Sequence, residues 1–294
     1  QNIFQIFMFK YILYYLKNFL ILIRINKPTG IMLLMFPAIW SILIVLKEEI
    51  DIYLIFLFAY GSFIMRSAGC IINDIIDIKF DKNVKRTKSR PLASENLEIT
   101  DAIILFIIFI SIGLSILLTL NSTCILLGLI VFPLILIYPL MKRYTNLPQI
   151  FLAIVFNFSV LISWAAAKGE FDYQSLLLYL TCFFWTLGYD TIYACQDKED
   201  DKKIGVKSLA IYLEKNINFW ISFFYLSFVI VFSLVGILNN INFIFFIFLL
   251  SFALKIMYDF FKTRKLKSKN FIKIFQVNSW YGFFITIGLF LNYI

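Results

Sequence analysis

Long apolar runs and short polar stretches alternate along the whole chain of 294 residues. A helix needs roughly 20 apolar residues to cross the hydrocarbon core of a bilayer, and runs of about that length recur nine times. The pattern therefore predicts an all-α polytopic membrane bundle of about nine transmembrane helices. The expected spans are 29–46, 52–72, 102–120, 123–141, 149–167, 173–194, 217–238, 242–261 and 274–293.

The first 24 residues differ from these spans because they mix basic side chains with aromatic and aliphatic ones. Lys10, Lys17 and Arg24 are spread among them, and no cleavage site of small residues follows. This composition favours a helix that lies in the membrane interface over a cleaved signal peptide. We therefore expect an interfacial segment at 1–24 and a single transmembrane domain at 25–294.

Composition and charge agree with a membrane protein. Hydrophobic residues make up 61% of the chain and the mean hydropathy is +0.86, which excludes an ordinary soluble domain. The net charge of +9 does not indicate nucleic-acid binding, because the basic residues are concentrated in alternate loops. Eighteen Lys and Arg lie in one set of loops and two in the other. The positive-inside rule places the larger set in the cytoplasm, together with the N-terminus.

The chain contains no histidine, which excludes imidazole bases and histidine metal ligands. Its four cysteines lie in or beside apolar runs without C-x-x-C spacing. We interpret them as small core residues rather than as a zinc site or a disulfide framework. The ligands of any metal ion are then expected to be oxygen atoms.

Three acidic residues follow the second predicted span, between Asn73 and Asp81. At 100° per residue, Asp74, Asp77 and Asp81 lie within about 60° of one another on one helix face. Carboxylates this close repel one another at a membrane boundary unless a cation lies among them. Oxygen ligands alone suit Mg²⁺, which is usually completed by water and substrate phosphates. A solvated helix end with scattered acids is the alternative interpretation.

A second acidic face follows the sixth predicted span. Asp190, Asp197 and Asp201 lie within about 40° of one another on a helix. One such pattern is a weak signal, but two acidic faces on the same side of one membrane protein predict a shared site of catalytic and metal-binding carboxylates. An ion-coupled transporter is less favoured, because apart from Arg66 and Lys255 the span interiors carry no charge.

Basic residues surround both acidic faces and would suit a diphosphate, although the positive-inside rule alone would also place them here. They are Lys82, Lys85, Arg86, Arg90, Lys202, Lys203 and Lys207. Arg86 and Arg90, close to the first acidic face, are our preferred pair. Arg66, inside the second span, has either a structural partner or a substrate role. Lys142 and Arg143 either pair with an anionic substrate or anchor the end of the fourth span.

At these residues the chain resembles the UbiA superfamily of intramembrane aromatic prenyltransferases, whose motifs are N-D-x-x-D-x-x-x-D and D-x-x-x-D. The first motif stands unbroken at 73–81 and the second at 197–201. Further strings are similar to those of the branch that prenylates 4-hydroxybenzoate. They include Arg24-x-x-Lys27-Pro28-Thr29-Gly30, Ser89-Arg90-Pro91-Leu92, Tyr138-Pro139-Leu140-Met141-Lys142-Arg143 and Gly188-Tyr189-Asp190-Thr191-Ile192-Tyr193-Ala194.

The resemblance implies an enzyme of ubiquinone biosynthesis that transfers a polyprenyl group from a polyprenyl diphosphate to the ring carbon ortho to the hydroxyl of 4-hydroxybenzoate. It implies that Mg²⁺ is held by five carboxylates, those of Asp74, Asp77, Asp81, Asp197 and Asp201. It also implies that Arg143 lies near the carboxylate of the acceptor. We expect the remaining substrate contacts from Asn73, Arg66, Arg86, Arg90, Tyr193 and Lys202. The site would face the cytoplasm from the inner membrane of a bacterium.

Several alternatives stay open on sequence alone. Haem, menaquinone and chlorophyll precursors are acceptors of other members of the superfamily, which share the first motif. The base that removes the ring proton is either an acid such as Asp190 or the released diphosphate. A scaffold without catalytic activity would leave two energetically costly acidic clusters unexplained, so we favour an enzyme.

Overall fold

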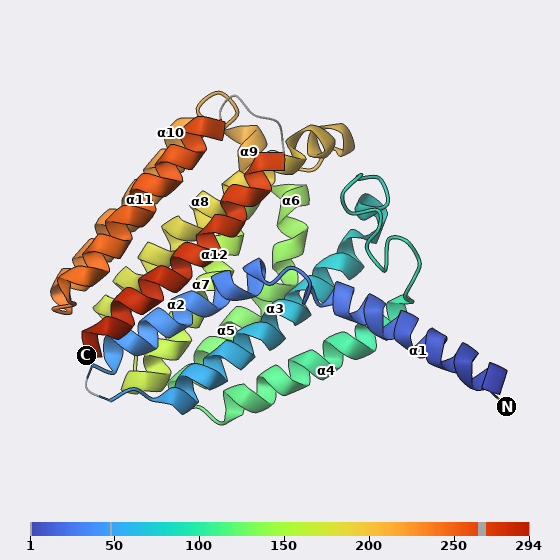
Figure 1. Ribbon diagram of the computed structural model, residues 1–294, viewed down its shortest axis with the longest axis horizontal. Coiled ribbons are helices and arrows are strands. Elements are labelled where there is room, and N and C mark those ends of the chain that lie inside the picture. Colours follow the sequence, from blue (N-terminus) through green and yellow to red (C-terminus); the bar gives the residue numbers. More distant parts are fainter. Residues whose placement is uncertain (1, 48, 264–268, 294) are drawn as a thin grey trace.

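The protein is a bundle of long helices (Figure 1). The computed structural model describes residues 2–47, 49–263 and 269–293, and every regular element within these ranges is a helix. The elements are α1 (Asn2–Leu22), α2 (Thr29–Val45), α3 (Ile52–Asp81), α4 (Ile99–Leu118), α5 (Ser122–Ile137), η1 (Tyr138–Leu140), α6 (Met141–Tyr144), α7 (Pro148–Lys168), α8 (Tyr173–Ile204), α9 (Leu209–Tyr212), α10 (Ile217–Leu238), α11 (Phe243–Thr263), α12 (Lys269–Phe290) and η2 (Leu291–Tyr293).

Each predicted span coincides with one long helix, namely α2 to α5, α7, α8 and α10 to α12. Within the described ranges, six helical segments are long and apolar enough to cross a membrane, and α2 is a shorter apolar helix. The prediction of an all-α membrane bundle is therefore confirmed. The number of spans, nine by pattern and six by the stricter criterion of length and hydropathy, is approximate.

Two helices continue beyond their predicted spans and carry the acidic clusters. α3 runs on to Asp81 and α8 to Ile204, although the apolar pattern ends about ten residues earlier in each. Asp51 caps the start of α3 by accepting a hydrogen bond of 2.8 Å from a backbone N–H of the first turn. Gly205 ends α8 in the left-handed conformation, with φ of 73°. The acids thus stand on helical extensions rather than on loops.

An aromatic core holds the central helices together. The indoles of Trp40 on α2 and Trp185 on α8 are fully buried, with ring centroids 4.9 Å apart. Phe228 and Phe232 of α10 pack against Trp40, and the Trp40 Nε1 atom donates a hydrogen bond of 2.9 Å to Thr286 of α12. Buried aromatic rings with satisfied polar atoms fix neighbouring helices relative to one another. This core supports the acidic extension of α8.

The basic connections gather at one end of the bundle. Figure 1 shows the α3–α4 connection, α6 and α9 at that end, and the α4–α5 and α7–α8 connections at the opposite end. This arrangement agrees with the predicted division of the loops between the two sides of a membrane. Residues 264–268, which hold part of the predicted cytoplasmic charge, lie outside the described residues.

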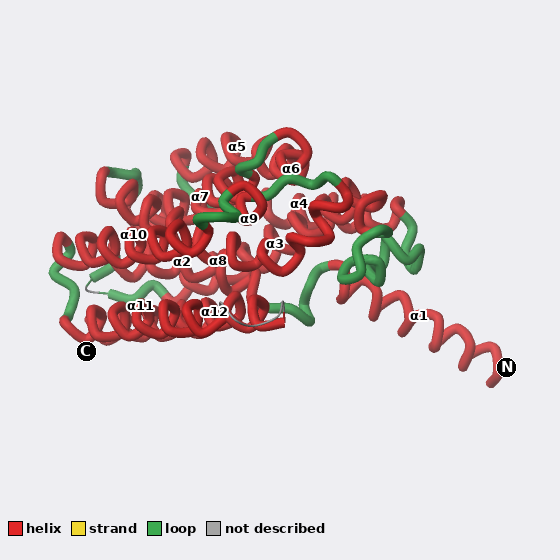
Figure 2. The backbone as a smooth tube through the Cα atoms, turned by 90° about the horizontal axis from the view of Figure 1, so that it is seen from above, coloured by secondary structure: helices red, strands yellow, loops and turns green. Residues whose placement is uncertain are grey.

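Helix α1 extends beyond the bundle and away from the other helices (Figure 2). Only its C-terminal part packs on the bundle, where Leu22 is fully buried against α3 and α4. Farther out, Phe9 and Tyr11 are about 60% exposed and flank Lys10. Exposed apolar and basic side chains on one helix are typical of a segment at a membrane surface. The interfacial role of residues 1–24 stays a prediction.

Candidate active site

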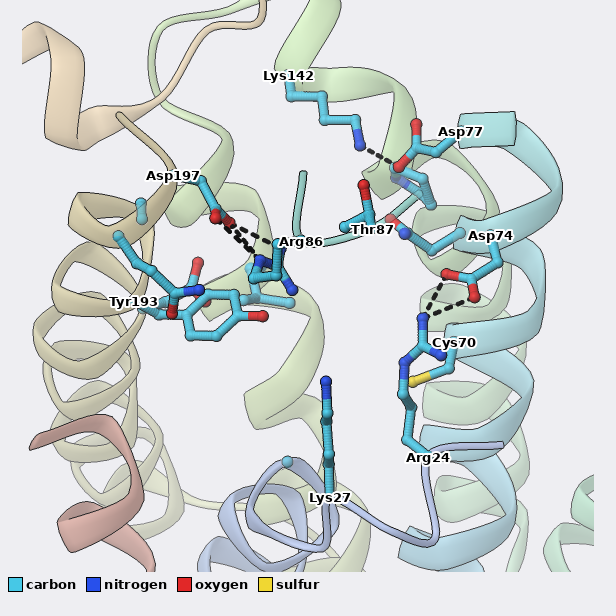
Figure 3. A pocket seen from close by; sticks show the side chains of 18 of the residues that line it. Arg24, Lys27, Cys70, Asp74, Asp77, Arg86, Thr87, Lys142, Tyr193 and Asp197 are labelled. Carbon is cyan, nitrogen blue, oxygen red and sulfur yellow. Dashed lines mark hydrogen bonds and ion pairs between the residues drawn. The ribbon is translucent and has the colours of Figure 1, made fainter. Parts of the chain in front are cut away.

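A cavity of about 740 Å³ lies between the acidic extensions of α3 and α8. All six predicted carboxylates line it, and so do Asn73, Arg66, Arg86, Arg90 and Tyr193. Figure 3 shows the two acidic helices facing each other across the space, with basic side chains between them. The α3 acids and the α8 acids are therefore brought to one site, although more than 100 residues separate them in the sequence.

The acids of α3 are almost completely buried and are paired with arginines. Asp74 is 1% exposed and accepts hydrogen bonds from Arg24 at 2.6 and 2.7 Å and from Arg90 at 2.9 Å. The same Arg90 nitrogen binds Asp81 at 2.7 Å. A buried carboxylate is stable only when cations and hydrogen bonds compensate its lost hydration. These pairs supply that compensation and fix both carboxylates.

Asp77 lies between the two other acids of α3 and has a different partner. It is 1% exposed, and its Oδ2 atom accepts a hydrogen bond from the Lys142 ammonium. Its Oδ1 atom is buried and accepts no hydrogen bond from the described residues, although an Arg143 nitrogen lies 3.6 Å away. A buried anionic oxygen without a hydrogen bond has an unused lone pair. Asp77 is thus available to a cation in the cavity.

The acids of α8 are less enclosed. Asp197 binds Arg86 through two guanidinium nitrogens, with distances from Nε to Oδ1 of 2.9 Å and from Nη2 to Oδ2 of 2.7 Å. Asp201, one turn later, has no ion pair with any described cation. Burial, reinforced by Asp197, raises the pKa of Asp201 to about 7. The second acidic face therefore has spare capacity for a metal ion.

Basic side chains offset the charge of the six carboxylates in the cavity. Burial alone would lower the pKa of Arg86, but Tyr193 and Asp197 outweigh it, so this pKa is raised and the guanidinium stays charged. Lys27 points into the space between the two acidic helices (Figure 3) and makes no ion pair with a described residue. Burial, together with Arg24 and other arginines, lowers the pKa of Lys27. A free ammonium repelled by its neighbours favours an anionic ligand.

The inner part of the cavity contains one half-buried arginine without an ion-pair contact. Arg66 lies over the ring of Phe156 at 5.2 Å and donates no hydrogen bond to a described residue. Asp190 interacts with it electrostatically. A Cβ atom on Gly30 would lie 2.8 Å from the Arg66 Nε atom, so only glycine lets the guanidinium approach the first turn of α2. The start of α2 has no side-chain cap and offers amide N–H groups nearby.

Comparison with known proteins agrees with this geometry. Residues 34–285 match the UbiA prenyltransferase family. The chain belongs to this family. It is 37% identical over 278 residues to a 4-hydroxybenzoate octaprenyltransferase of Coxiella burnetii, covering 95% of this chain and 97% of that protein. It is 40% identical to the protein of the same name from Psychromonas ingrahamii, covering 93% and 95%.

Solved structures of UbiA homologues share the fold. The apo structure from Aeropyrum pernix has a TM-score of 0.74 and 21% identity, covering 90% of this chain and 98% of that one. The structure of an Archaeoglobus fulgidus homologue bound to GPP and Mg²⁺ has a TM-score of 0.71 and 15% identity, covering 92% and 99%. The predictions of the family, of its helical fold and of a prenyltransferase are confirmed.

Two predicted substrate contacts do not line the cavity of this UbiA family member. The Lys202 ammonium binds Glu214 at 2.9 Å on the outer side of α8, because it lies about 100° around the helix from Asp201. Arg143 donates to the Ile76 carbonyl and covers the ring of Phe80 at 5.0 Å. Its neighbour Lys142 faces the cavity instead. Neither side chain lines the cavity, and the roles of Arg143 and Lys202 as direct ligands stay predictions.

Three contributors to the cavity were missed as functional residues by the sequence analysis. Arg24 and Lys27 stand in a string of the family resemblance, but nothing in the local sequence indicates that they reach α3 or the cavity. Phe275 of α12 also lines the cavity, and its only sequence signal is an apolar position in a predicted span. Only the contacts between distant helices show that these three side chains reach the cavity.

The residues present fit a magnesium ion that is completed by a substrate. In the described part of the chain, no three acidic or cysteine side chains converge on one point, and four of the carboxylates are bound by Arg24, Arg90, Lys142 and Arg86 instead. Mg²⁺ usually takes one or two carboxylates with water and substrate phosphates, so a closed protein cage is not required. The open Oδ1 atom of Asp77 is the donor that the chemistry demands.

Proposed function

We propose that this protein transfers a polyprenyl group from a polyprenyl diphosphate to the ring carbon ortho to the hydroxyl of 4-hydroxybenzoate, in a reaction that depends on Mg²⁺. The observation that carries the proposal is the convergence of two acidic helices and several cations on one cavity of about 740 Å³ in a membrane bundle. The acceptor is inferred from relatives that are 37% and 40% identical over almost the whole chain.

The diphosphate of the donor would bind between the acidic faces of α3 and α8. Mg²⁺, held by Asp74, Asp77, Asp81, Asp197 and Asp201, would neutralise charge on the diphosphate oxygens. The side chains Arg86, Arg90, Lys142 and Lys27 line the same space. Arg86, Arg90 and Lys142 can exchange a carboxylate partner for a phosphate oxygen, and Lys27 can bind one directly, since a charged donor binds either anion. The apolar prenyl chain would then lie among the membrane helices.

The acceptor would bind in the inner part of the cavity, with its carboxylate on Arg66. This guanidinium has no competing hydrogen-bond acceptor among the described residues, and it is held against the uncapped start of α2. A planar guanidinium beside amide N–H groups suits a carboxylate. We therefore prefer Arg66 to Arg143 as the ligand, because Arg143 donates to the Ile76 carbonyl, lies over Phe80 and does not line the cavity.

The side chains divide the chemistry between them. Arg86, Arg90 and Lys142 stabilise the negative charge that builds on the diphosphate as the allylic C–O bond breaks and the electron pair leaves with oxygen. The aromatic walls exclude water from the allylic cation. The ring carbon ortho to the phenol oxygen attacks to form the new C–C bond, and the ring proton passes to Asp190 or to the diphosphate. As in the sequence analysis, Asp190 and the diphosphate are both candidates for this base.

The setting of the reaction follows from topology and from the relatives. The basic end of the bundle, where the cavity lies, would face the cytoplasm, and the bacterial relatives favour the inner membrane. The product would enter the bilayer as an intermediate of ubiquinone biosynthesis. These assignments are part of the proposal.

The test is acceptor choice by the purified protein in detergent, with a polyprenyl diphosphate and Mg²⁺. We expect prenylation of 4-hydroxybenzoate and none of haem or of a dihydroxynaphthoate. A protein that leaves 4-hydroxybenzoate unmodified while it prenylates one of the others would overturn the acceptor assignment and leave the family assignment intact. Benzoate without the phenol should inhibit competitively, because it retains the carboxylate that Arg66 would bind.

A further inference from the structure

Phe275 of α12 lies outside every motif that defines the site, yet it packs on the helix that carries the second acidic face. Its ring centroid is 4.8 Å from that of Tyr193 and 5.9 Å from that of Tyr189. Tyr189, Tyr193 and Asp197 follow one another at intervals of four residues and so share one face of α8. Phe275 therefore supports two successive turns of the helix, directly before Asp197.

The guanidinium of Arg86 in turn lies against the ring of Tyr193 (Figure 3). The Cζ atom of Arg86 lies 5.4 Å from the centroid of this ring, which is within the range of a cation–π interaction. Arg86 belongs to the α3–α4 connection, where residues 82–98 form turns and no long helix. Its position consequently depends on its two contacts with α8, the ring of Tyr193 and the carboxylate of Asp197.

Helix α12 is fixed beside α8 by Asn278, three residues after Phe275. Asn278 is fully buried, and its Oδ1 atom accepts hydrogen bonds of 3.0 Å from Trp185 of α8 and from Tyr225 of α10. Its Nδ2 atom donates to the Ile274 carbonyl at 2.8 Å. A satisfied polar group inside an apolar core holds helices in one register, because any sliding would leave it unpaired. Phe275 is therefore kept against Tyr193.

We propose that Phe275 is a positioning residue that acts through Tyr193 to keep the Arg86 guanidinium directed at the diphosphate of the donor. This inference rests on the proposed function. Asp197 is also a proposed metal ligand, and a carboxylate engaged with a metal ion offers less to Arg86. The aromatic ring does not compete for the metal, so it is the contact with α8 that remains when the diphosphate and its metal ion bind.

The test is the calorimetric affinity for inorganic pyrophosphate with Mg²⁺, measured in detergent without an acceptor. We expect Phe275→Leu to weaken binding about 3- to 10-fold, the range of a partly desolvated cation–π contact. In the background of Arg86→Gln, which removes the cation, Phe275→Leu should have no further effect. Phe275→Tyr, which keeps the ring, should bind as the parent does. In turnover, the KM for the donor should rise by the same factor while kcat is retained.

Phe271→Leu is the matched control, since Phe271 lies one turn earlier on α12, is partly buried and does not line the cavity. Its affinity should equal that of the parent. Unchanged affinity in Phe275→Leu, or a loss that adds to that of Arg86→Gln, would overturn the inference. Phe275→Met repeats the test if the leucine variant unfolds. A parent that neither binds pyrophosphate with Mg²⁺ nor prenylates any acceptor would instead overturn the proposed function itself.

Discussion

The acidic faces of α3 and α8 share a sequence spacing but differ in their surroundings. Asp74 and Asp77 of α3 are 1% exposed, and each is held by cations from other segments. On α8, Asp197 has a single partner in Arg86, and Asp201 has none among the described cations. The same D-x-x-x-D type of spacing therefore forms one rigid, compensated cluster and one more open cluster. We expect α3 to set the position of the metal ion and α8 to close around it.

The largest effect that this comparison predicts is at Asp77. Asp77→Asn removes the carboxylate with an open oxygen and leaves Lys142 without its anion, so we expect turnover to fall about 1,000-fold, a loss typical of a central electrostatic group. Excess Mg²⁺ should not restore it. The measurement is the initial rate over a range of Mg²⁺ concentrations. Asp172→Asn, at the opposite end of α8, is the control, because asparagine also caps a helix. Activity near that of the parent in Asp77→Asn would remove α3 from the mechanism.

A smaller loss is expected at Asp197, on the more open face. Asp197→Asn should lower turnover about 100-fold, the upper part of the range for groups that support a metal ion. Because the α3 carboxylates remain, raising the Mg²⁺ concentration should recover part of the rate. The comparison between the two asparagine variants is the measurement. If both variants lost the same activity and added Mg²⁺ restored neither, the two faces would contribute equally, contrary to the difference in their burial.

The inner part of the cavity offers a prediction that separates two arginines. Arg66→Gln should raise the KM for 4-hydroxybenzoate about 10- to 100-fold, because a hydrogen bond to a charged group contributes about 1.5–3 kcal/mol. Arg143→Gln should change it less than about threefold, because this side chain faces Phe80. The KM for the polyprenyl donor serves as the internal control in both variants. A larger increase in this KM for Arg143→Gln than for Arg66→Gln would favour Arg143 as the ligand of the carboxylate, as the family resemblance implied.

The smallest predicted effect concerns Lys27 and pH. Burial, together with Arg24, Arg86 and Arg90, lowers the pKa of Lys27 from its ordinary value of 10.5. As pH rises through this lowered pKa, the ammonium loses its charge, so affinity for the diphosphate should fall about threefold in the alkaline range. Lys27→Arg should remove this dependence, since an arginine stays protonated. Pyrophosphate binding between about pH 7 and pH 10 checks it. The same alkaline decline in both proteins would assign it to another group.

The apolar pattern is sufficient to predict the membrane bundle, because hydrophobic length is a local property of the sequence. It is also sufficient to place three carboxylates on one face of α3, where the 3.6-residue repeat decides the geometry. The pattern does not decide whether Lys142 or Arg143 faces the cavity. These neighbours differ by about 100° around a single turn of helix, and only the packing of α6 against α3 determines which one faces the cavity.

Contacts between distant segments were equally inaccessible to the sequence analysis. Arg24 reaches Asp74 across 50 positions and Arg86 reaches Asp197 across 111. Lys202 was expected at the substrate, but the structure pairs it with Glu214 on the outer side of α8. Local charge density could not separate a ligand from a solvated cation, because the positive-inside rule places both in the same loops.

The most direct test of one shared site is the rate of 4-hydroxybenzoate prenylation in the parent, Asp77→Ala and Asp197→Ala, each with Mg²⁺ and with EDTA. We expect product that depends on Mg²⁺ in the parent and is abolished or reduced to a small fraction in both variants, although all three proteins unfold at similar temperatures. Full activity in either folded variant, or full activity of the parent in EDTA, would contradict the claim that the two acidic helices hold one metal-dependent site.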